Sequence, residues 1–160
     1  MTIENSNEKH EIRVQPIENG TVIDHITAGQ ALNVLKIIGK PGTSEGIMSV
    51  LINAPSSHGK KDVIKIEGRE INAQEFDKIA LIAPNATINI IRNFKVASKK
   101  QVQIPEHIEG VVKCVNPNCI TNSNEPIKSN FTVNNENRNV FLRCDYCERI
   151  ISENIADNLI

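Results

Sequence analysis

Residues 20–39 read GTVIDHITAGQALNVLKIIG, and this stretch decides the fold of the first part of the chain. Its opening residues, Thr21 to Ile26, are mostly β-branched or apolar and predict a strand. Its later apolar residues recur at helical spacing and share one face: Ala28, Ala31, Leu32, Leu35 and Ile38. Thr27 is expected to cap this helix and Gly39 to end it. A strand that passes directly into an amphipathic helix predicts a domain of mixed α and β structure.

Further extended segments are predicted on both sides of this unit. Before it, Ile12, Val14 and Ile17 predict an extended stretch, which the turn signal Asn19-Gly20 connects to the first strand. After it, the sequence predicts strands at 47–54, 61–67 and 87–96, with a loop at 55–59.

A second helix is predicted between the last two of these strands. Asn72 and Glu75 are typical of a capping box, and Pro84 closes the helix. Its inward face is expected to carry Phe76, Ile79, Ala80 and Ala83. Without the stretch before Gly20, the order is β-α-β-β-α-β. That order is typical of ferredoxin-like folds, in which two helices cover one face of an antiparallel sheet.

The pattern breaks around Gln103 to His107, where Pro105 suits a linker. We therefore expect two domains, residues 1–103 and residues 104–160. The second contains all the cysteines and two short apolar segments that suit strands, 131–133 and 140–143. So small a domain with few large apolar side chains rarely keeps its fold without an additional cross-link such as a disulfide or a structural metal. The fold class is α+β: a ferredoxin-like antiparallel sheet with two helices, then a small all-β domain of the zinc-ribbon kind.

Composition and charge exclude several classes of protein. The chain has 160 residues, of which 39% are hydrophobic, and its net charge is −1. It has no apolar run near the ~20 residues of a membrane span and no signal peptide, so we expect a cytoplasmic protein with no membrane partner. With no positive excess and only 3% aromatic residues, no nucleic acid partner is expected either.

The cysteines form the most specific motif. Cys114 and Cys119 make one pair and Cys144 and Cys147 another, with 24 residues between the pairs. Four thiolates complete the tetrahedral shell of Zn²⁺ and leave no open position for water or substrate. The alternative, two disulfides, is rare in a cytoplasmic protein. We therefore expect one structural zinc ion per chain, a feature that zinc ribbons use for many functions.

Polar residues of the first domain suggest a binding surface. Asp24-His25 lies near the end of a strand, and Lys61 and Lys65 alternate along another strand with apolar residues. Such residues are often only a solvated sheet face. The functional interpretation is a pocket in which lysines and His25 meet phosphates. Two competing motifs are weak: 39–43 lacks the full spacing of a phosphate loop, and Ser57, His58 and Asp62 make no distinctive catalytic set.

Five segments in order closely resemble the regulatory chains of aspartate carbamoyltransferase. The segments are 20–26 (GTVIDHI), 61–67 (KDVIKIE), 83–89 (APNATIN), Cys114-x-Asn116-x-Asn118-Cys119 and Cys144-x-Tyr146-Cys147-Glu148. The resemblance runs from about Ile12 to Ile151. It implies a non-catalytic subunit of an enzyme of pyrimidine biosynthesis. In that family the N-terminal domain binds CTP as inhibitor, often helped by UTP, and ATP as activator.

The resemblance also implies partners. The zinc domain is expected to dock on the catalytic chain, and regulatory chains are expected to pair through their N-terminal domains. Dimers of regulatory chains then tie two catalytic trimers into a dodecamer of six catalytic and six regulatory chains. Within the metal-binding segment, Asn116, Asn118, Glu148 and Arg149 are candidates for the docking surface.

Carried over residue by residue, the resemblance implies roles at the nucleotide site. Asp24 would meet the ribose and His25 the phosphates; Lys65 would reach ribose and base. Asn89 and Lys99 would hold the phosphate chain, with Lys61 beside the pocket. The walls and backbone contacts are expected to be Val14, Ile17, Val22, Val63, Phe94 and Val96. The chain departs from the family at Gln15, where Glu is familiar, and at Phe94, where Tyr is familiar.

Two other classes of protein compete with this interpretation. A zinc-ribbon protein that binds nucleic acid or assists transcription should show a basic stripe and exposed aromatic residues. A small enzyme should show an activated nucleophile or an open metal site. The sequence has no clear sign of either.

Overall fold

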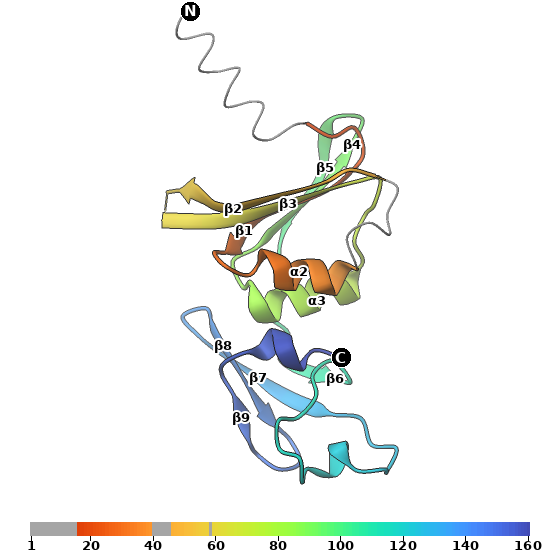
Figure 1. Ribbon diagram of the computed structural model, residues 1–160, viewed down its shortest axis with the longest axis vertical. Coiled ribbons are helices and arrows are strands. Elements are labelled where there is room, and N and C mark those ends of the chain that lie inside the picture. Colours follow the sequence, from red (N-terminus) through yellow and green to blue (C-terminus); the bar gives the residue numbers. More distant parts are fainter. Residues whose placement is uncertain (1–15, 40–45, 58) are drawn as a thin grey trace, which may run out of the picture.

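The first domain is a sheet of five antiparallel strands with two helices. The computed structural model describes residues 16–39, 46–57 and 59–160. In chain order the elements are β1 (Gly20–Thr27), α2 (Ala31–Ile38), β2 (Met48–Ser56), β3 (Gly59–Glu67), α3 (Ala73–Ile82), β4 (Thr87–Arg92) and β5 (Lys95–Gln101). The strands lie in the order β2-β3-β1-β4-β5 (Figure 1). Without β5 this is the ferredoxin-like order, so the predicted fold class is confirmed.

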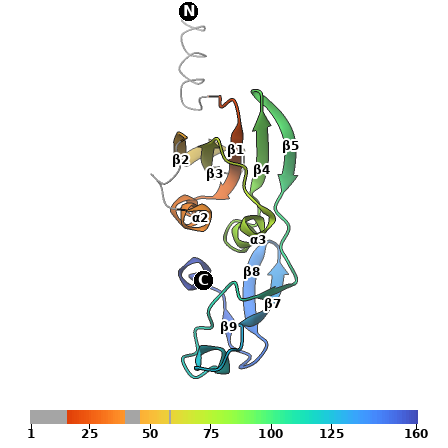
Figure 2. The ribbon, with the colours of Figure 1, turned by 90° about the vertical axis from the view of Figure 1, so that its right-hand side faces the viewer.

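The core of the first domain lies between the sheet and both helices. Ile23 of β1 and Ile64 of β3 are fully buried, as are Val34 of α2 and Ile79 of α3. Because side chains alternate along a strand, the intervening residues of β1 and β3 face the other side of the sheet. Figure 2 shows α2 and α3 on the same side of this sheet. The opposite side, called here the outer face, carries no helix in the described part of the chain.

The first helix starts later than predicted. Thr27 does not cap it, because α2 begins at Ala31 after Gln30, whose side chain makes no capping bond. Ala28 therefore lies outside the helix, and Leu32 is 61% exposed, whereas Val34 takes the predicted inward place. The late start has a tertiary cause, a buried carboxylate on β3 that is described below. At the other end Gly39 follows with a φ of 113°, a conformation that favours glycine.

The second helix begins as predicted. The Asn72 side chain accepts the Glu75 N–H at 2.9 Å, and the Glu75 carboxylate accepts the Asn72 N–H at 3.1 Å. Glu75 is buried and also accepts a bond of 2.7 Å from Arg69, whose guanidinium donates in addition to the Ile38 carbonyl oxygen. The capping box is confirmed, and Arg69 joins the start of α3 to the end of α2.

Two predicted strand boundaries are wrong. The expected strand 87–96 is a hairpin, β4 and β5, that turns at Asn93 and Phe94 with φ of 53° and 64°. Such a turn usually contains glycine, so the sequence did not reveal it. The expected loop 55–59 is shorter, because Pro55 and Ser56 still pair with β3.

The start of the domain also differs from the prediction. Gly20 is the first residue of β1 rather than a turn residue, and a side chain there would collide with the Ile66 carbonyl oxygen. Ile17 lies just before β1 and belongs to no strand. The predicted Ile12 and Val14 lie outside the described residues.

The second domain is a sheet of four antiparallel strands, as predicted in class. Its elements are β6 (His107–Glu109), the short helix η1 (Ile120–Asn122), β7 (Asn130–Glu136), β8 (Asn139–Cys144), β9 (Ile150–Ile151) and the short helix η2 (Ile155–Asn158). The order in the sheet is β6-β7-β8-β9, and the predicted short strands fall within β7 and β8. Phe131 and Leu142 are fully buried between this sheet and its loops.

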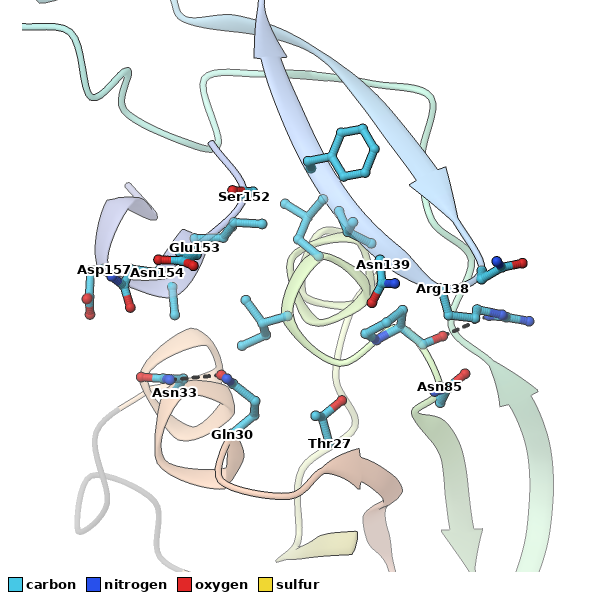
Figure 3. Close-up of a pocket in the computed structure, with 18 residues that line it drawn as sticks. Thr27, Gln30, Asn33, Asn85, Arg138, Asn139, Ser152, Glu153, Asn154 and Asp157 are labelled. Carbon is cyan, nitrogen blue, oxygen red and sulfur yellow. Dashed lines mark hydrogen bonds between the residues drawn. The ribbon is translucent and has the colours of Figure 1, made fainter. Parts of the chain in front are cut away.

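The two domains meet at α3. Lys78 of α3 donates to the Ile160 carbonyl oxygen at 3.2 Å, and Arg138, in the turn between β7 and β8, donates to the Pro84 carbonyl oxygen at 2.8 Å. Buried apolar residues form one cluster through both domains. Beside this junction lies a cleft of about 670 Å³, which Figure 3 shows with Gln30 and Asn33 on one side and Ser152 and Glu153 on the other.

Candidate functional site

The four cysteines converge on one point of the second domain. Their sulfur atoms all lie within 4.8 Å of one another. Cys114 and Cys147 are 3.6 Å apart at sulfur, and Cys119 and Cys144 are 3.7 Å apart. All four are free thiols, so the alternative of two disulfides is wrong. Zinc bound at ~2.3 Å to each sulfur would set the sulfurs about 3.8 Å apart, which these distances match.

Hydrogen bonds around the cluster prepare the sulfurs for a cation. A hydrogen bond from the Arg149 backbone N–H, with further bonds from Asn116 and the neighbouring cysteines, lowers the pKa of the Cys147 thiol to about 6. Burial opposes ionisation of Cys119, but the Thr121 hydroxyl, 3.2 Å from its sulfur, and backbone bonding lower its pKa on balance. Burial raises the pKa of Cys114 to about 12. Metal ligands must be thiolates, so a bound cation would offset that cost.

The donor set assigns the metal a structural function. Four sulfurs close the shell of a tetrahedral zinc ion, which would cross-link the β6–β7 connection to the end of β8. The loop between Cys114 and Cys119 is further held by Asn122, whose amide donates to the carbonyl oxygens of Cys114 and Asn116 at 2.9 and 2.7 Å. The backbone around the cluster is therefore fixed at several points.

The second candidate site is a row of residues across the outer face of the first sheet. Lys65 of β3 lies opposite Val22 of β1, Val22 lies opposite Asn89 of β4, and Asn89 lies opposite Lys99 of β5. Directly opposed residues share a face, so these four side chains follow one another across four strands. Asn89 also donates from its amide to the Val22 carbonyl oxygen at 3.5 Å. The fold thus brings together four residues that were predicted from separate segments.

An irregularity in β1 brings two more of them to this surface. Ile23 pairs with Ile64 and Ile26 with Asp62, so Asp24 and His25 together oppose the single residue Val63. This two-against-one arrangement is a β-bulge, and His25 adopts the left-handed conformation with a φ of 56°. The bulge lets Ile23 and Ile26 both point into the core while Asp24 and His25 stay accessible.

Asp24 is the acidic member of the site and is paired. Lys61 Nζ lies 2.9 Å from Asp24 Oδ1, and the His25 backbone N–H donates to the same oxygen at 2.6 Å. Burial alone would raise the pKa of Asp24, but the bonds from Lys61 and His25 lower it below its usual value. Asp24 therefore remains a carboxylate that can accept hydrogen bonds from hydroxyl groups.

Lys65 is the least exposed cation of the site. It is only 8% exposed, and desolvation lowers its pKa from the usual value. A neighbouring anion would favour its charged form. Val63, on the same strand and face, is 8% exposed and contributes an apolar wall.

The remaining predicted residues lie at the far edge of the outer face. Val96 pairs with Ile91 and Lys99 with Asn89, and the register shift between these pairs puts Val96 and Lys99 on one face although three positions separate them. Phe94, in the β4–β5 turn, is 64% exposed, and its N–H donates to the Glu18 carbonyl oxygen at 2.9 Å. Ile17 is half-buried and directly precedes Glu18, the residue that accepts this bond. Val14 and Gln15 lie outside the described residues.

One functional candidate was missed in the sequence. Asp62 appeared only in an undistinctive catalytic set, yet it is fully buried and accepts three backbone N–H bonds. Its partners are main-chain groups, which any residue supplies, so no motif signals it. The cleft of Figure 3 contains none of the predicted nucleotide residues among its lining residues.

Exposed residues surround the metal cluster. Val115, in the Cys114–Cys119 loop, is 38% exposed and Ile120, directly after the loop, is 45% exposed. Tyr146 is 50% exposed between the last two cysteines. Asn118 is exposed at the loop tip, while Arg143 and Glu148 form an exposed ion pair of 2.9 Å. No helix in the described residues is long and apolar enough to cross a membrane.

Comparison with known proteins matches both domains to one family. Residues 12–103 match the family model of the aspartate carbamoyltransferase regulatory chain, allosteric domain, and residues 106–157 match that of its metal binding domain. The aspartate carbamoyltransferase regulatory chain of Methanococcoides burtonii is 65% identical over 157 residues, covering 97% of this chain and 99% of the relative. That of Methanosarcina barkeri is 58% identical, covering 96% and 99%. That of Korarchaeum cryptofilum is 49% identical, covering 94% and 98%.

Two matched domains in this order, and identities of 49% to 65% over nearly full length, leave one assignment. The chain belongs to the family of aspartate carbamoyltransferase regulatory chains, the non-catalytic subunits of that enzyme, with an allosteric domain followed by a metal-binding domain.

Proposed function

We propose that this chain controls pyrimidine biosynthesis by binding nucleoside triphosphates on the outer face of its first sheet. The observation that carries the proposal is the row Lys65, Val22, Asn89 and Lys99, with the bulged Asp24 and His25 beside it. A triphosphate is strongly anionic, and three basic groups with one amide on an open face suit it. CTP as inhibitor, ATP as activator and UTP as co-inhibitor are the proposed effectors.

Each residue has a proposed contact. Lys99, Asn89 and His25 hold the phosphates, because the exposed Lys99 and His25 and the half-buried Asn89 offer donors on this face. Asp24 accepts hydroxyl groups of the ribose, and the buried Lys65 reaches the ribose and base. Lys61 holds Asp24 in place. The apolar contacts come from Val14, Ile17, Val22, Val63, Phe94 and Val96.

Calorimetry on the full chain tests this site with a matched pair of variants. Charge-assisted hydrogen bonds contribute about 1.5–3 kcal/mol each, so Lys99→Ala should lower the affinities for CTP and ATP roughly ten- to a hundredfold. Lys100→Ala makes the same charge change, but Lys100 pairs with the core-side residue Ile88 and lies on the other face. It should leave both affinities within about twofold. Equal affinity for Lys99→Ala and the natural chain would rule out the site.

The proposed effect of the nucleotide requires the assembled enzyme. An effector changes activity only if it favours one quaternary state over another, and coupling is typically ~1–3 kcal/mol. The isolated chain should therefore bind nucleotide without turnover. Assays of catalytic trimers with and without this chain should show a nucleotide response only when the chain is present. Hydrolysis of nucleotide by the isolated chain would contradict the proposal.

The metal-binding domain is proposed to dock on the catalytic chain through the surface around the sulfurs. The Cys114–Cys119 loop is pinned at both ends and by Asn122, so docking costs little ordering entropy. Asn118→Ala should weaken assembly with catalytic trimers while zinc content stays unchanged. Asn139→Ala, an exposed change at the β7–β8 turn, is the control. Native mass spectrometry of the mixtures distinguishes these outcomes; equal assembly by both variants would contradict the docking surface.

Pairing of regulatory chains is proposed to use the first domain. β2 is an edge strand, and it exposes Val50 and Ile52 by 38% and 50%. An exposed apolar edge is a ready template for a second chain. In sedimentation experiments on the regulatory chain alone, Val50→Glu should lower the fraction of dimer. Mixed with catalytic trimers, the natural chain should form dodecamers of six regulatory and six catalytic chains. A dimer unaffected by Val50→Glu would place the contact elsewhere.

The metal is proposed to be one zinc ion per chain, in keeping with a cytoplasmic protein whose thiols stay reduced. Elemental analysis of the purified chain should give one zinc per chain. A thiol-specific mercurial should release it together with the structure of the second domain.

A further inference from the structure

We propose that Asp62 is a positioning residue for the nucleotide site. Its buried carboxylate holds two adjacent β-bulges, one of which presents Asp24 and His25 on the outer face. The inference rests on the proposed function of that face.

Asp62 is bonded only through main-chain donors in the described structure. Its Oδ2 accepts the N–H groups of Gly29 at 3.0 Å and Ala31 at 3.1 Å, and its Oδ1 accepts the Asn53 N–H at 3.0 Å. Gly29 and Ala31 lie at the start of α2, and Asn53 lies in β2. One carboxylate thus fixes β3 to the elements on both of its sides, and it replaces the missing cap of α2.

Both neighbouring strands are irregular beside this carboxylate. In β1, Asp24 and His25 oppose Val63; in β2, Ile52 and Asn53 oppose Asp62 itself. Each bulge contains one left-handed residue, His25 with a φ of 56° and Asn53 with a φ of 59°. Regular pairing of β1 resumes at Ile26, directly opposite Asp62.

The bonds of Asp62 therefore act on the site through the backbone. The residue before it, Lys61, holds Asp24 at 2.9 Å. The bonds to Gly29 and Ala31 fix the chain just after β1, so that the bulge cannot relax by sliding toward α2. If these bonds were lost, β1 could populate arrangements in which Asp24 and His25 are misplaced. Apparent affinity falls in proportion to the competent fraction.

Asp62→Asn is the informative change, because an amide has only one acceptor oxygen for the three backbone N–H groups that the carboxylate accepts. Its NH₂ group would face one or more of these donors and could not bond to them. In the full, zinc-loaded chain this substitution should lower the affinity for CTP by about tenfold or more. The control is Glu75→Gln, the same change at the buried carboxylate that opens α3, remote from the outer face. It should lower thermal stability but leave CTP affinity unchanged. Unchanged affinity for folded Asp62→Asn, or an equal loss for Glu75→Gln, would overturn the proposal.

A second readout needs no nucleotide. The ring C–H resonances of His25 in the NMR spectrum should shift in Asp62→Asn and stay in place in Glu75→Gln. If the natural chain binds no CTP, the proposed function fails. The positioning role of Asp62 is then still tested by whether the His25 resonances shift in Asp62→Asn. Unmoved His25 resonances would overturn it.

Where Asp62→Asn does not fold, the exposed Asn53 provides the same test. Asn53→Val disfavours the left-handed conformation that presents its N–H to Asp62, whereas Asn53→Gly retains that conformation. Asn53→Val should shift the His25 resonances and Asn53→Gly should not. Identical spectra for the two variants would overturn the proposal.

Discussion

The two domains of this chain are held together by different means. The first has a core of Ile, Val, Leu and Ala residues between sheet and helices, in which Ile23, Ile64 and Ile79 are fully buried. The second has fewer buried apolar residues, of which Val112, Phe131 and Leu142 are fully buried, and it adds four sulfur atoms within 4.8 Å of one another. A domain too small for an adequate apolar core would obtain additional stability from metal–sulfur bonds at such a cluster.

Removal of the metal is the strongest way to separate the two domains. Zinc binding contributes about 10–16 kcal/mol in small zinc domains, more than such a domain's own stability. A chelator should therefore unfold the second domain and leave the first folded. Hydrogen exchange with mass spectrometry should show protection lost in β7 and β8 but retained in β1 and β3. Cys144→Ser should reproduce this pattern without a chelator, and protection of β7 and β8 in the metal-free chain would contradict it.

A cavity in the apolar core should destabilise the first domain and leave the second domain unchanged. Ile23→Ala removes a fully buried side chain, so the free energy of unfolding of the first domain should fall by about 2–5 kcal/mol, as urea denaturation can measure. Zinc content should not change. Leu32→Ala, at a position 61% exposed, is the control and should change stability by about 0.5 kcal/mol or less. A loss of zinc from Ile23→Ala would mean that the two domains fold as one unit.

The two helix starts allow a finer comparison inside the first domain. Asn72→Ala removes a side-chain cap of α3 and should cost about 1 kcal/mol of stability. Gln30→Ala, at the equivalent position of α2, removes no capping bond and should cost only a few tenths of a kcal/mol. Chemical denaturation of both variants tests this difference. Equal losses would show that Gln30 supports α2 in some other way.

The smallest expected effect concerns the acid end of the pH range. The pKa of Asp24 in the folded chain is lowered below 3.8 because Lys61 and the His25 N–H outweigh the effect of burial. The pair therefore stabilises the fold fully above about pH 3.8, and its contribution is lost as the pH falls through the lowered pKa. Lys61→Met should move the Asp24 pKa, measured by NMR titration, back upward. An unchanged Asp24 titration would show that Lys61 is not the main cause.

Regular patterns in the sequence predicted much of this structure. The order of β1, α2, β2, β3 and α3 and the capping box at Asn72 follow from local spacing, because each depends on residues a few positions apart. The cysteine cluster was predicted from two close pairs with 24 residues between them. The residues of the proposed nucleotide site were expected from the family resemblance, and their roles stay predictions. The strand pairing supports them by placing Val22, Lys65, Asn89 and Lys99 in one row.

The features that local patterns did not predict depend on pairing between strands. The bulges at His25 and Asn53 exist because, between two paired positions, β1 and β2 each place two residues opposite a single residue of β3. The turn at Asn93 and Phe94 uses left-handed residues without a glycine. Asp62 replaces the predicted cap of α2 from another strand, and its main-chain partners leave no trace in the side-chain sequence.

The position of β1 inside its sheet has a consequence for synthesis of the chain. Its two partners are β3 and β4, both of which are translated later, whereas β6, β7, β8 and β9 pair in the order in which they leave the ribosome. The nascent chain must therefore carry the apolar β1 unpaired until residues 59–67 have emerged. Non-local pairing of this kind slows folding and prolongs exposure to aggregation. We therefore expect the first domain to expose an unpaired strand for longer during translation than the second, whose sheet can close strand by strand.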